Sequence, residues 1–235
     1  MLTPISHDLK TPLSAVMRAA DTLRDYGPAM DEGDRAMLLT TVIDEGERLN
    51  RFIANLPDMT RIGSGALRPN LALEDVSDVV GSALHRAEKI TAGHVVITDL
   101  AADLPMVLID PVLFEQVLFN LLDNASKYSP PGSTVLIRAR DDQRAVILQV
   151  LDSGPGLPEA DLECVFDSLY RVLKGDHARV GSGLGLSICC GFIEATVGSI
   201  VAENRSDAPG AVLTIRLPIP AQGPRRTASE MEPPG

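Results

Sequence analysis

His7 and its neighbours form the first group in this sequence whose residue types and spacing could do chemistry. His7 lies two positions from Ile5 and from Leu9, within an apolar repeat at steps of three and four residues. A helix turns about 100° per residue, so His7 faces away from that apolar side, towards solvent. An exposed imidazole next to Asp8 is a candidate nucleophile, because the carboxylate can orient the ring or take its proton. Most exposed helical histidines are only polar surface residues, so this group does not suffice by itself.

A second group is a polar stripe along a mostly apolar helical segment, residues 112–128. Its members recur at helical spacing and are Gln116, Asn120, Asn124 and Lys127. Amide oxygens suit Mg²⁺, a hard cation that usually keeps several waters and shares phosphate oxygens, and a lysine adds positive charge nearby. A buried, hydrogen-bonded pair of amides is the alternative interpretation.

The turn Asp152-Ser153-Gly154-Pro155-Gly156 follows an apolar strand pattern at 145–151. Asp152 continues the apolar side of that strand, where a carboxylate is costly unless something donates a hydrogen bond to it. An exocyclic amine such as N6 of adenine would satisfy the carboxylate, and the two glycines would let the backbone approach the ring. An ordinary Asp-Gly turn is the alternative.

A glycine-rich stretch, residues 181–186, opens the helical segment that runs to Ala195. Free backbone N–H groups and the positive end of a helix favour a phosphate at such a position. Many glycine turns only cap helices, and a dinucleotide fingerprint would directly follow an early strand, not a long loop late in the chain. We therefore expect phosphate binding here and reject the dinucleotide interpretation.

Two helical patterns position His7. The first starts at Ile5 and is ended by Tyr26-Gly27-Pro28, and the second runs from Leu38 to Leu56. Joined by a short polar turn, they make an antiparallel hairpin that leaves much of both apolar stripes in water. A second copy that completes a four-helix bundle is the simplest cover, so the pattern predicts a homodimer.

The other groups lie beyond Gly63-Ser64-Gly65, where the helical period ends. Strand-like runs then alternate with helical stretches, with strands expected at 71–73, 95–98, 107–109, 135–138, 145–151, 200–203 and 212–217 and helices at 76–88, 112–128 and 184–195. The sequence thus predicts an α+β chain with a helical hairpin domain over 1–64, a mixed sheet covered by three helices over 65–220, and a disordered tail over 221–235.

Composition restricts the classes of function. A net charge of −11 over 235 residues argues against nucleic acid as a partner, because binding to its phosphate backbone needs a basic surface. No apolar run is long enough to cross a bilayer and no leader opens the chain, so we expect a cytoplasmic segment without membrane contact of its own, compatible with the soluble part of a membrane-anchored sensor. The adjacent Cys189 and Cys190 fit helix packing in a reducing compartment better than a redox or metal role.

Taken together, these motifs resemble the transmitter region of sensor histidine kinases in order and in spacing. The matching runs are Ser6 to Leu13 for the phosphoacceptor box, Asn120 to Tyr128 for the N box, Asp152 to Gly156 for the first glycine box, Phe166 to Arg171 for the F box and Gly181 to Leu186 for the second glycine box. The resemblance spans residues 3 to about 217, and its wording is closest to the potassium-sensing branch of the family.

The resemblance implies a dimeric helical hairpin followed by an α/β-sandwich catalytic domain of the Bergerat ATP-binding fold. It implies ATP and Mg²⁺ as cofactors and the receiver domain of a response regulator as partner. His7 would accept the γ-phosphoryl group and pass it to an Asp of that partner, Asp8 would act as general base, and Thr11 would position water when the enzyme runs in reverse as a phosphatase.

The same resemblance assigns residues to the nucleotide. The assignments are Asn120 and Asn124 as Mg²⁺ ligands, Lys127 and Tyr128 facing the nucleotide, Asp152, Gly154 and Gly156 at the adenine, Gly181, Gly183, Leu184 and Gly185 in a lid over the phosphates, and Arg171 against the γ-phosphate. Hydrolytic relatives carry a Glu where this helix has Asn120, so the resemblance favours transfer to His7 over hydrolysis.

Some residues depart from the family pattern. Pro57 interrupts the second helical pattern and should bend or weaken the hairpin, Leu169 replaces an aromatic residue, and Thr196-Val197-Gly198 replaces the usual His-Gly-Gly. These departures support an alternative, a degenerate, non-catalytic kinase homologue that acts as a dimeric ATP-binding regulatory module. A Bergerat-fold ATPase that only hydrolyses ATP is a further alternative, which Asn120 disfavours.

The stimulus, the identity of the response regulator and the choice between cis and trans phosphorylation stay open at this point. Because the first helix starts so close to His7, we expect the chain to be part of a longer sensor.

Overall fold

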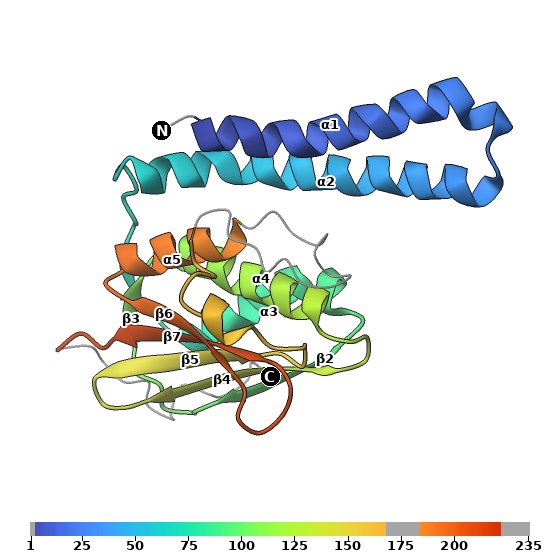
Figure 1. Cartoon of the computed structure of the whole chain (residues 1–235). Coiled ribbons are helices and arrows are strands. Elements are labelled where there is room, and N and C mark those ends of the chain that lie inside the picture. Colours follow the sequence, from blue (N-terminus) through green and yellow to red (C-terminus); the bar gives the residue numbers. More distant parts are fainter. Residues whose placement is uncertain (1–2, 168–183, 222–235) are drawn as a thin grey trace, which may run out of the picture. The chain divides into compact units, whose positions relative to one another are not determined.

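The computed structural model describes residues 3–167 and 184–221, apart from the side chains of residues 3–8 and of a few positions in the second helix. The chain divides into two compact units, Met1–Arg61 and Ile62–Gly235, which are described one at a time (Figure 1). Among the described residues, no helix is long and apolar enough to cross a membrane.

The first unit is the expected helical hairpin. Helix α1 spans Thr3–Tyr26, a 3₁₀ turn spans Gly27–Ala29, and helix α2 spans Glu32–Gly63. Asp31 starts α2 by accepting a 2.8 Å hydrogen bond from the Asp34 N–H, as an N-cap does. Pro57 lies inside α2, which continues beyond it to Gly63, so this proline does not end the helix.

A mixed sheet of five strands forms the second unit, in the order β2-β4-β5-β7-β6. The strands are β2 (Val95–Leu100), β4 (Thr134–Asp141), β5 (Ala145–Leu151), β6 (Ser199–Asn204) and β7 (Ala211–Pro218). Strands β2 and β4 pair in parallel, and the other neighbours pair antiparallel. The strand pattern and the mixed sheet expected from the sequence are therefore confirmed.

Two of the expected strands do not join that sheet. Strands β1 (Ala72–Glu74) and β3 (Val107–Ile109) pair with each other in a separate two-stranded antiparallel sheet, with Leu73 opposite Leu108. The prediction that all the strands belong to a single sheet was therefore wrong. The alternation of apolar and polar residues identifies a strand but carries no information about its partner.

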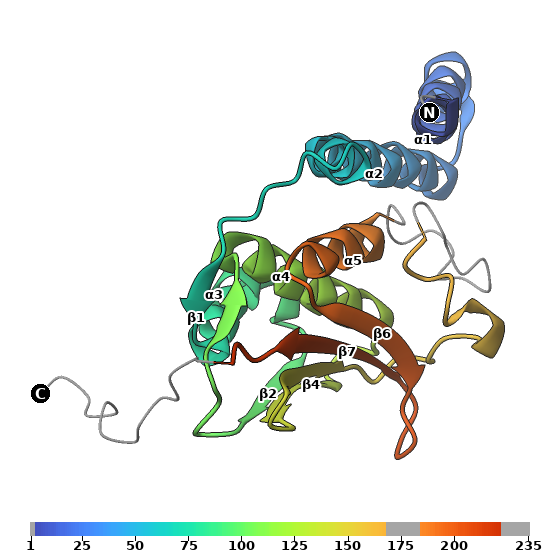
Figure 2. The same ribbon diagram turned by 90° about the vertical axis from the view of Figure 1, so that its left-hand side faces the viewer.

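Helices α3 (Val76–Thr91), α4 (Pro111–Tyr128) and α5 (Gly185–Ala195) cover one face of the five-stranded sheet (Figure 2). The largest fully buried side chains lie between these layers and include Phe114, Leu118, Leu121 and Leu122 of α4, Ile137, Leu148 and Ile215 of the sheet, and Ile188, Phe192 and Ile193 of α5. Helix α4 is central in this layer, because it packs against both α3 and α5.

Buried Asp110 starts α4. Its Oδ1 accepts hydrogen bonds from the N–H groups of Val112 (3.0 Å) and Leu113 (3.2 Å), and its Oδ2 accepts one from the N–H of Asn70 (2.7 Å). One carboxylate thus satisfies the free first turn of α4 and fixes the segment before β1 to the same point.

The end of α5 is a Schellman motif with an unusual residue. The N–H of Gly198 donates to the Ile193 carbonyl and that of Val197 to the Glu194 carbonyl, both at 3.0 Å. Such a motif needs a left-handed residue, usually glycine, and Val197 takes that place with φ of 60°. A β-branched residue in this conformation is strained.

Candidate functional site

The carboxylate of Asp152 is fixed by backbone at the end of β5. Its Oδ1 accepts hydrogen bonds from the N–H groups of Gly154 (2.8 Å) and Ala211 (3.0 Å). Both of these bonds from described residues fall on Oδ1, which leaves Oδ2 to accept from a ligand. Arg205, the residue that follows β6, donates to the main-chain carbonyl of Asp152 at 3.1 Å and so also fixes this turn. Neither Arg205 nor Ala211 could be selected from the sequence, because strand pairing brings them there.

Glycines shape this turn by allowing close approach of protein to protein. A Cβ on Gly154 would lie 2.8 Å from the carbonyl oxygen of Tyr128, and one on Gly156, where φ is 76°, would lie 2.6 Å from Oδ1 of Asn204. Gly210 is the tightest of all, because its Cβ would lie 2.2 Å from the main-chain oxygen of Asp152. The sequence suggested that the glycines of the turn make room for a ring, and the structure shows a packing requirement for them.

The end of α4 and the Asp152 turn are joined directly. The hydroxyl of Ser129, the residue that follows α4, accepts a 3.2 Å hydrogen bond from the N–H of Ser153, and the Ser153 hydroxyl donates to the Thr134 carbonyl at 2.7 Å. Gly154 also lies close to the main chain of Tyr128. These contacts fix the position of the Asp152 turn relative to the end of α4, the helix that carries the amide stripe.

The amide stripe of α4 forms partly as expected. The Gln116 side chain donates from Nε2 to Oδ1 of Asn120 at 3.1 Å, which is the hydrogen-bonded pair of amides considered above as the alternative to a metal site. The half-buried Asn124 side chain makes no hydrogen bond to a described residue. Lys127 forms an ion pair with Asp123 one turn earlier, so its charge is partly neutralised by the helix itself.

Asn120 also contacts helix α5. The Asn120 Nδ2 lies 3.7 Å from the sulfur of Cys189, and that sulfur lies 3.8 Å from the Val117 carbonyl oxygen. Burial raises the pKa of the Cys189 thiol to about 12, and the next residue, Cys190, has its pKa raised to about 11 for the same reason. Both cysteines are therefore protonated thiols near neutral pH, which agrees with the packing role expected for them.

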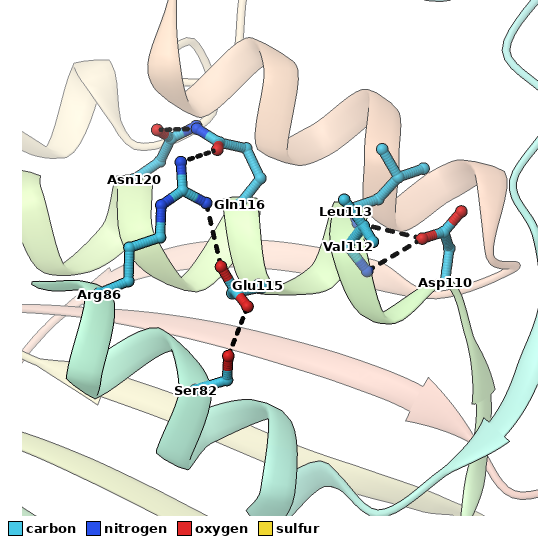
Figure 3. Close-up of polar contacts among 8 residues, drawn as sticks. All are labelled: Ser82, Arg86, Asp110, Val112, Leu113, Glu115, Gln116 and Asn120. Atoms are coloured by element: carbon cyan, nitrogen blue, oxygen red, sulfur yellow. Dashed lines mark hydrogen bonds and ion pairs between the residues drawn. The ribbon is translucent and has the colours of Figure 1, made fainter.

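A charged cluster that the sequence did not indicate connects α3 to this stripe (Figure 3). Arg86 donates from Nη2 to Oε1 of Gln116 at 2.8 Å and from Nη1 to Oε1 of Glu115 at 3.2 Å. Oε2 of Glu115 accepts a 2.6 Å bond from the hydroxyl of Ser82. The bond from Ser82, followed by the contact with Arg86, lowers the pKa of Glu115, so this carboxylate stays ionised.

The structure describes the other expected site residues to different extents. His7 and Asp8 lie in α1, with side chains outside the described part of the structure, and Thr11 lies in the same helix. Leu184 is buried, and Gly185 begins α5, where the first-turn N–H groups are not used within the helix. The remaining expected residues, Arg171, Gly181 and Gly183, and the F-box departure Leu169 lie outside the described residues.

The side-chain amide oxygens of the stripe are of a type that fits a magnesium ion bound together with a nucleotide. The Asn120 oxygen accepts one bond and has a second lone pair, and the Asn124 amide has no partner among the described residues. Among the described residues, no three His, Cys, Asp or Glu side chains gather as a metal cluster. A sparse set of protein ligands is typical of Mg²⁺ that is shared with phosphates and water.

Comparison with known proteins covers both units. Residues 1–65 match the His Kinase A (phospho-acceptor) domain, and residues 109–221 match the family described as histidine kinase-, DNA gyrase B-, and HSP90-like ATPase. The sensor protein KdpD of Clostridium acetobutylicum is 36% identical over 219 residues, a stretch that covers 93% of this chain and 24% of that protein. The adaptive-response sensory kinase SasA of Synechococcus elongatus is 34% identical, with coverage of 83% and 53%.

Solved structures agree with these matches. The histidine kinase AdeS of Acinetobacter baumannii has a TM-score of 0.69 and 26% identity, covering 91% of this chain and 98% of that one. A full-length ShkA structure in complex with AMPPNP has the same fold, with a TM-score of 0.64 and 22% identity. The chain spans about a quarter of KdpD and about half of SasA. It belongs to the family of sensor histidine kinases of two-component systems, and its phospho-acceptor hairpin and ATPase domain correspond to their transmitter core.

Proposed function

We propose that this chain uses Mg²⁺-ATP to phosphorylate His7 and then passes the phosphoryl group to an Asp of a response regulator. The observation that carries the proposal is the Asp152 carboxylate, whose Oδ1 is fixed by two backbone N–H groups at 2.8 and 3.0 Å. With Oδ1 fixed, Oδ2 is presented to a donor in a set orientation. An exocyclic amine of adenine is the donor that this arrangement suits.

In this proposal the residues around Asp152 have separate tasks. Asn120 and Asn124 would hold the metal ion, which would supply positive charge against the phosphates, and Lys127 and Tyr128 would line the nucleotide. The first turn of α5, from Leu184 and Gly185, offers N–H groups to the phosphates. No carboxylate stands at position 120 to activate water, which favours phosphoryl transfer over hydrolysis.

The phosphoryl step is a displacement at the γ-phosphorus. A ring nitrogen of His7 attacks the γ-phosphorus, the bond to the bridging oxygen breaks, and ADP leaves. Asp8 accepts the proton that the imidazole loses or holds the ring in place. In the second step an Asp carboxylate oxygen of the response regulator attacks the phosphorus of the phosphohistidine, the N–P bond breaks, and the His7 imidazole is regenerated. In the reverse, phosphatase mode Thr11 positions the water that hydrolyses the aspartyl phosphate and releases inorganic phosphate.

The hairpin works as a homodimer in this proposal. Its described side chains include large apolar residues that are about half exposed within the unit, namely Leu13, Met17, Met37, Leu39, Ile43 and Ile53. Apolar area of this kind on two long helices is stabilised when a second hairpin covers it. A symmetric pair would bury the same residues on both copies.

Incubation with γ-³²P-ATP and Mg²⁺ tests the proposal directly. We expect a phosphoryl label that is acid-labile and base-stable, that is absent from His7→Gln, and that persists in the matched control His85→Gln, whose histidine is exposed on α3. Asp152→Ala should lose both the label and nucleotide binding. Label of equal strength in His7→Gln, or nucleotide binding without any label, would refute the assignment. Phosphate release that does not depend on His7 would instead indicate hydrolysis.

A further inference from the structure

Hydrogen bonds connect five side chains of α3 and α4, and they fix which way the two amides among them are turned. The five are Ser82, Arg86, Glu115, Gln116 and Asn120. A guanidinium has only N–H donors, so the Gln116 side chain must turn its oxygen towards Arg86. Its –NH₂ group then points the other way and donates to Oδ1 of Asn120 (Figure 3). The orientation of each amide in this chain of contacts is thereby determined by a charge on a different helix.

Arg86 is itself held from several sides. Its guanidinium bonds to Glu115 at 3.2 Å and to Gln116 at 2.8 Å, and its Cζ lies 4.6 Å from the centre of the Phe119 ring. Ser82, one turn before Arg86 on α3, donates to the second oxygen of Glu115 at 2.6 Å. Such a network holds one guanidinium geometry more firmly than a single exposed ion pair would.

The two ends of the Asn120 amide are not equivalent. The –NH₂ end faces the fully buried Cys189 sulfur at 3.7 Å, and the oxygen end faces half-buried Gln116. The oxygen thus occupies the more accessible end of the amide, with one lone pair unused. A reversed Gln116 would offer an oxygen to Asn120, and Asn120 would then turn its –NH₂ group outward and its oxygen towards the buried thiol.

We propose that Arg86 is a positioning residue for the nucleotide site, which acts through Gln116 to keep the Asn120 oxygen turned towards the metal ion. The inference rests on the proposed function, in which Asn120 is a Mg²⁺ ligand. Partners of metal ligands that lie one hydrogen bond away commonly change metal affinity 10- to 100-fold. Arg86 acts through one further residue, so its loss should weaken apparent Mg²⁺ affinity about 3- to 10-fold.

The test measures binding of a fluorescent ATP analogue to the full chain over a Mg²⁺ titration and in EDTA, with Mn²⁺ binding followed by electron paramagnetic resonance. Arg86→Met should raise the half-saturating Mg²⁺ and Mn²⁺ concentrations about 3- to 10-fold and leave analogue affinity in EDTA unchanged. Arg86→Lys, which keeps a donor-only cation, should restore most of the loss. The matched control is Arg140→Met, because the Arg140 side chain is 48% exposed against 45% for Arg86 and also pairs with a carboxylate, Asp99 of β2.

A second variant separates positioning from folding. Glu115→Gln frees Arg86 without removing it and should give a smaller change in the same direction, with a melting temperature within the range of the Arg140→Met control. The inference is overturned if Arg86→Met matches wild type across the metal titration, or if it weakens binding equally in EDTA and in Mg²⁺. The proposed function fails separately if the wild-type chain binds the analogue with no dependence on metal or on Asp152, and the inference fails with it.

Discussion

Replacement of Val197 by glycine should stabilise the catalytic unit. An L-residue in the left-handed region costs roughly 1–2 kcal/mol, and Val197 has φ of 60°. The side chain is 80% exposed, so its removal loses only about 0.3 kcal/mol of burial. Glycine also lowers the free energy of unfolding by about 0.5 kcal/mol, because it gives the unfolded chain more conformational freedom. The balance is a gain of about 0.7 kcal/mol at the middle of this range, which for a unit of this size corresponds to about 1–3 °C in Tm.

Urea titration followed by far-UV circular dichroism would measure this gain. Val197→Ala should fall between wild type and Val197→Gly, because alanine lacks the β-branch but keeps the left-handed penalty. Gly198→Ala is the opposing control, since its Cβ would lie 2.9 Å from the Arg216 carbonyl oxygen and 3.0 Å from Cγ2 of Ile193. A Val197→Gly protein no more stable than wild type, beside a destabilised Gly198→Ala, would refute the argument that backbone strain is stored at residue 197.

Two further predictions concern buried groups. Asp110→Ala should lower the free energy of unfolding by about 2–3 kcal/mol, because three N–H groups lose their acceptor, whereas Asp75→Ala at the start of α3 should cost about 1 kcal/mol; urea titrations that rank the two the other way would contradict this. Cys189, with its pKa raised to about 12, should react with iodoacetamide at pH 8 about a thousandfold more slowly than an ordinary thiol in the folded chain, and normally in urea. Peptide mass spectrometry would decide, and rapid labelling of Cys189 without denaturant would show that α5 is not packed as described.

Many of the helices and strands could be predicted, because each depends on a periodic pattern of apolar residues over a short stretch of sequence. Alternation located β5 at 145–151, where it is found, and the helical stripe located α4 to within a residue at its start. The glycine run before residue 66 marked the end of α2 near Gly63. These signals need only near neighbours in the chain.

Contacts across elements could not be predicted in this way. Arg86 is thirty residues from Gln116, and nothing in the spacing of α3 indicates which α4 side chain it meets. Asp152 was expected to need a ligand to satisfy it, but pairing of β5 with β7 brings the Ala211 N–H to Oδ1. Val197 stood out from the sequence as a departure in the family pattern, and only its backbone angle reveals the strain.

The parallel pairing of β2 with β4 also governs how the domain can fold. Parallel neighbours need a crossover, and here the chain between Leu100 and Thr134 includes β3 and all of α4. Strand β2 therefore cannot join the sheet until that long loop closes, which is a slow kind of step. Until then the free edge of β4 is open to pairing with other chains. The crossover that contains Asn120 and Asn124 must therefore close before β2 can cover the edge of β4.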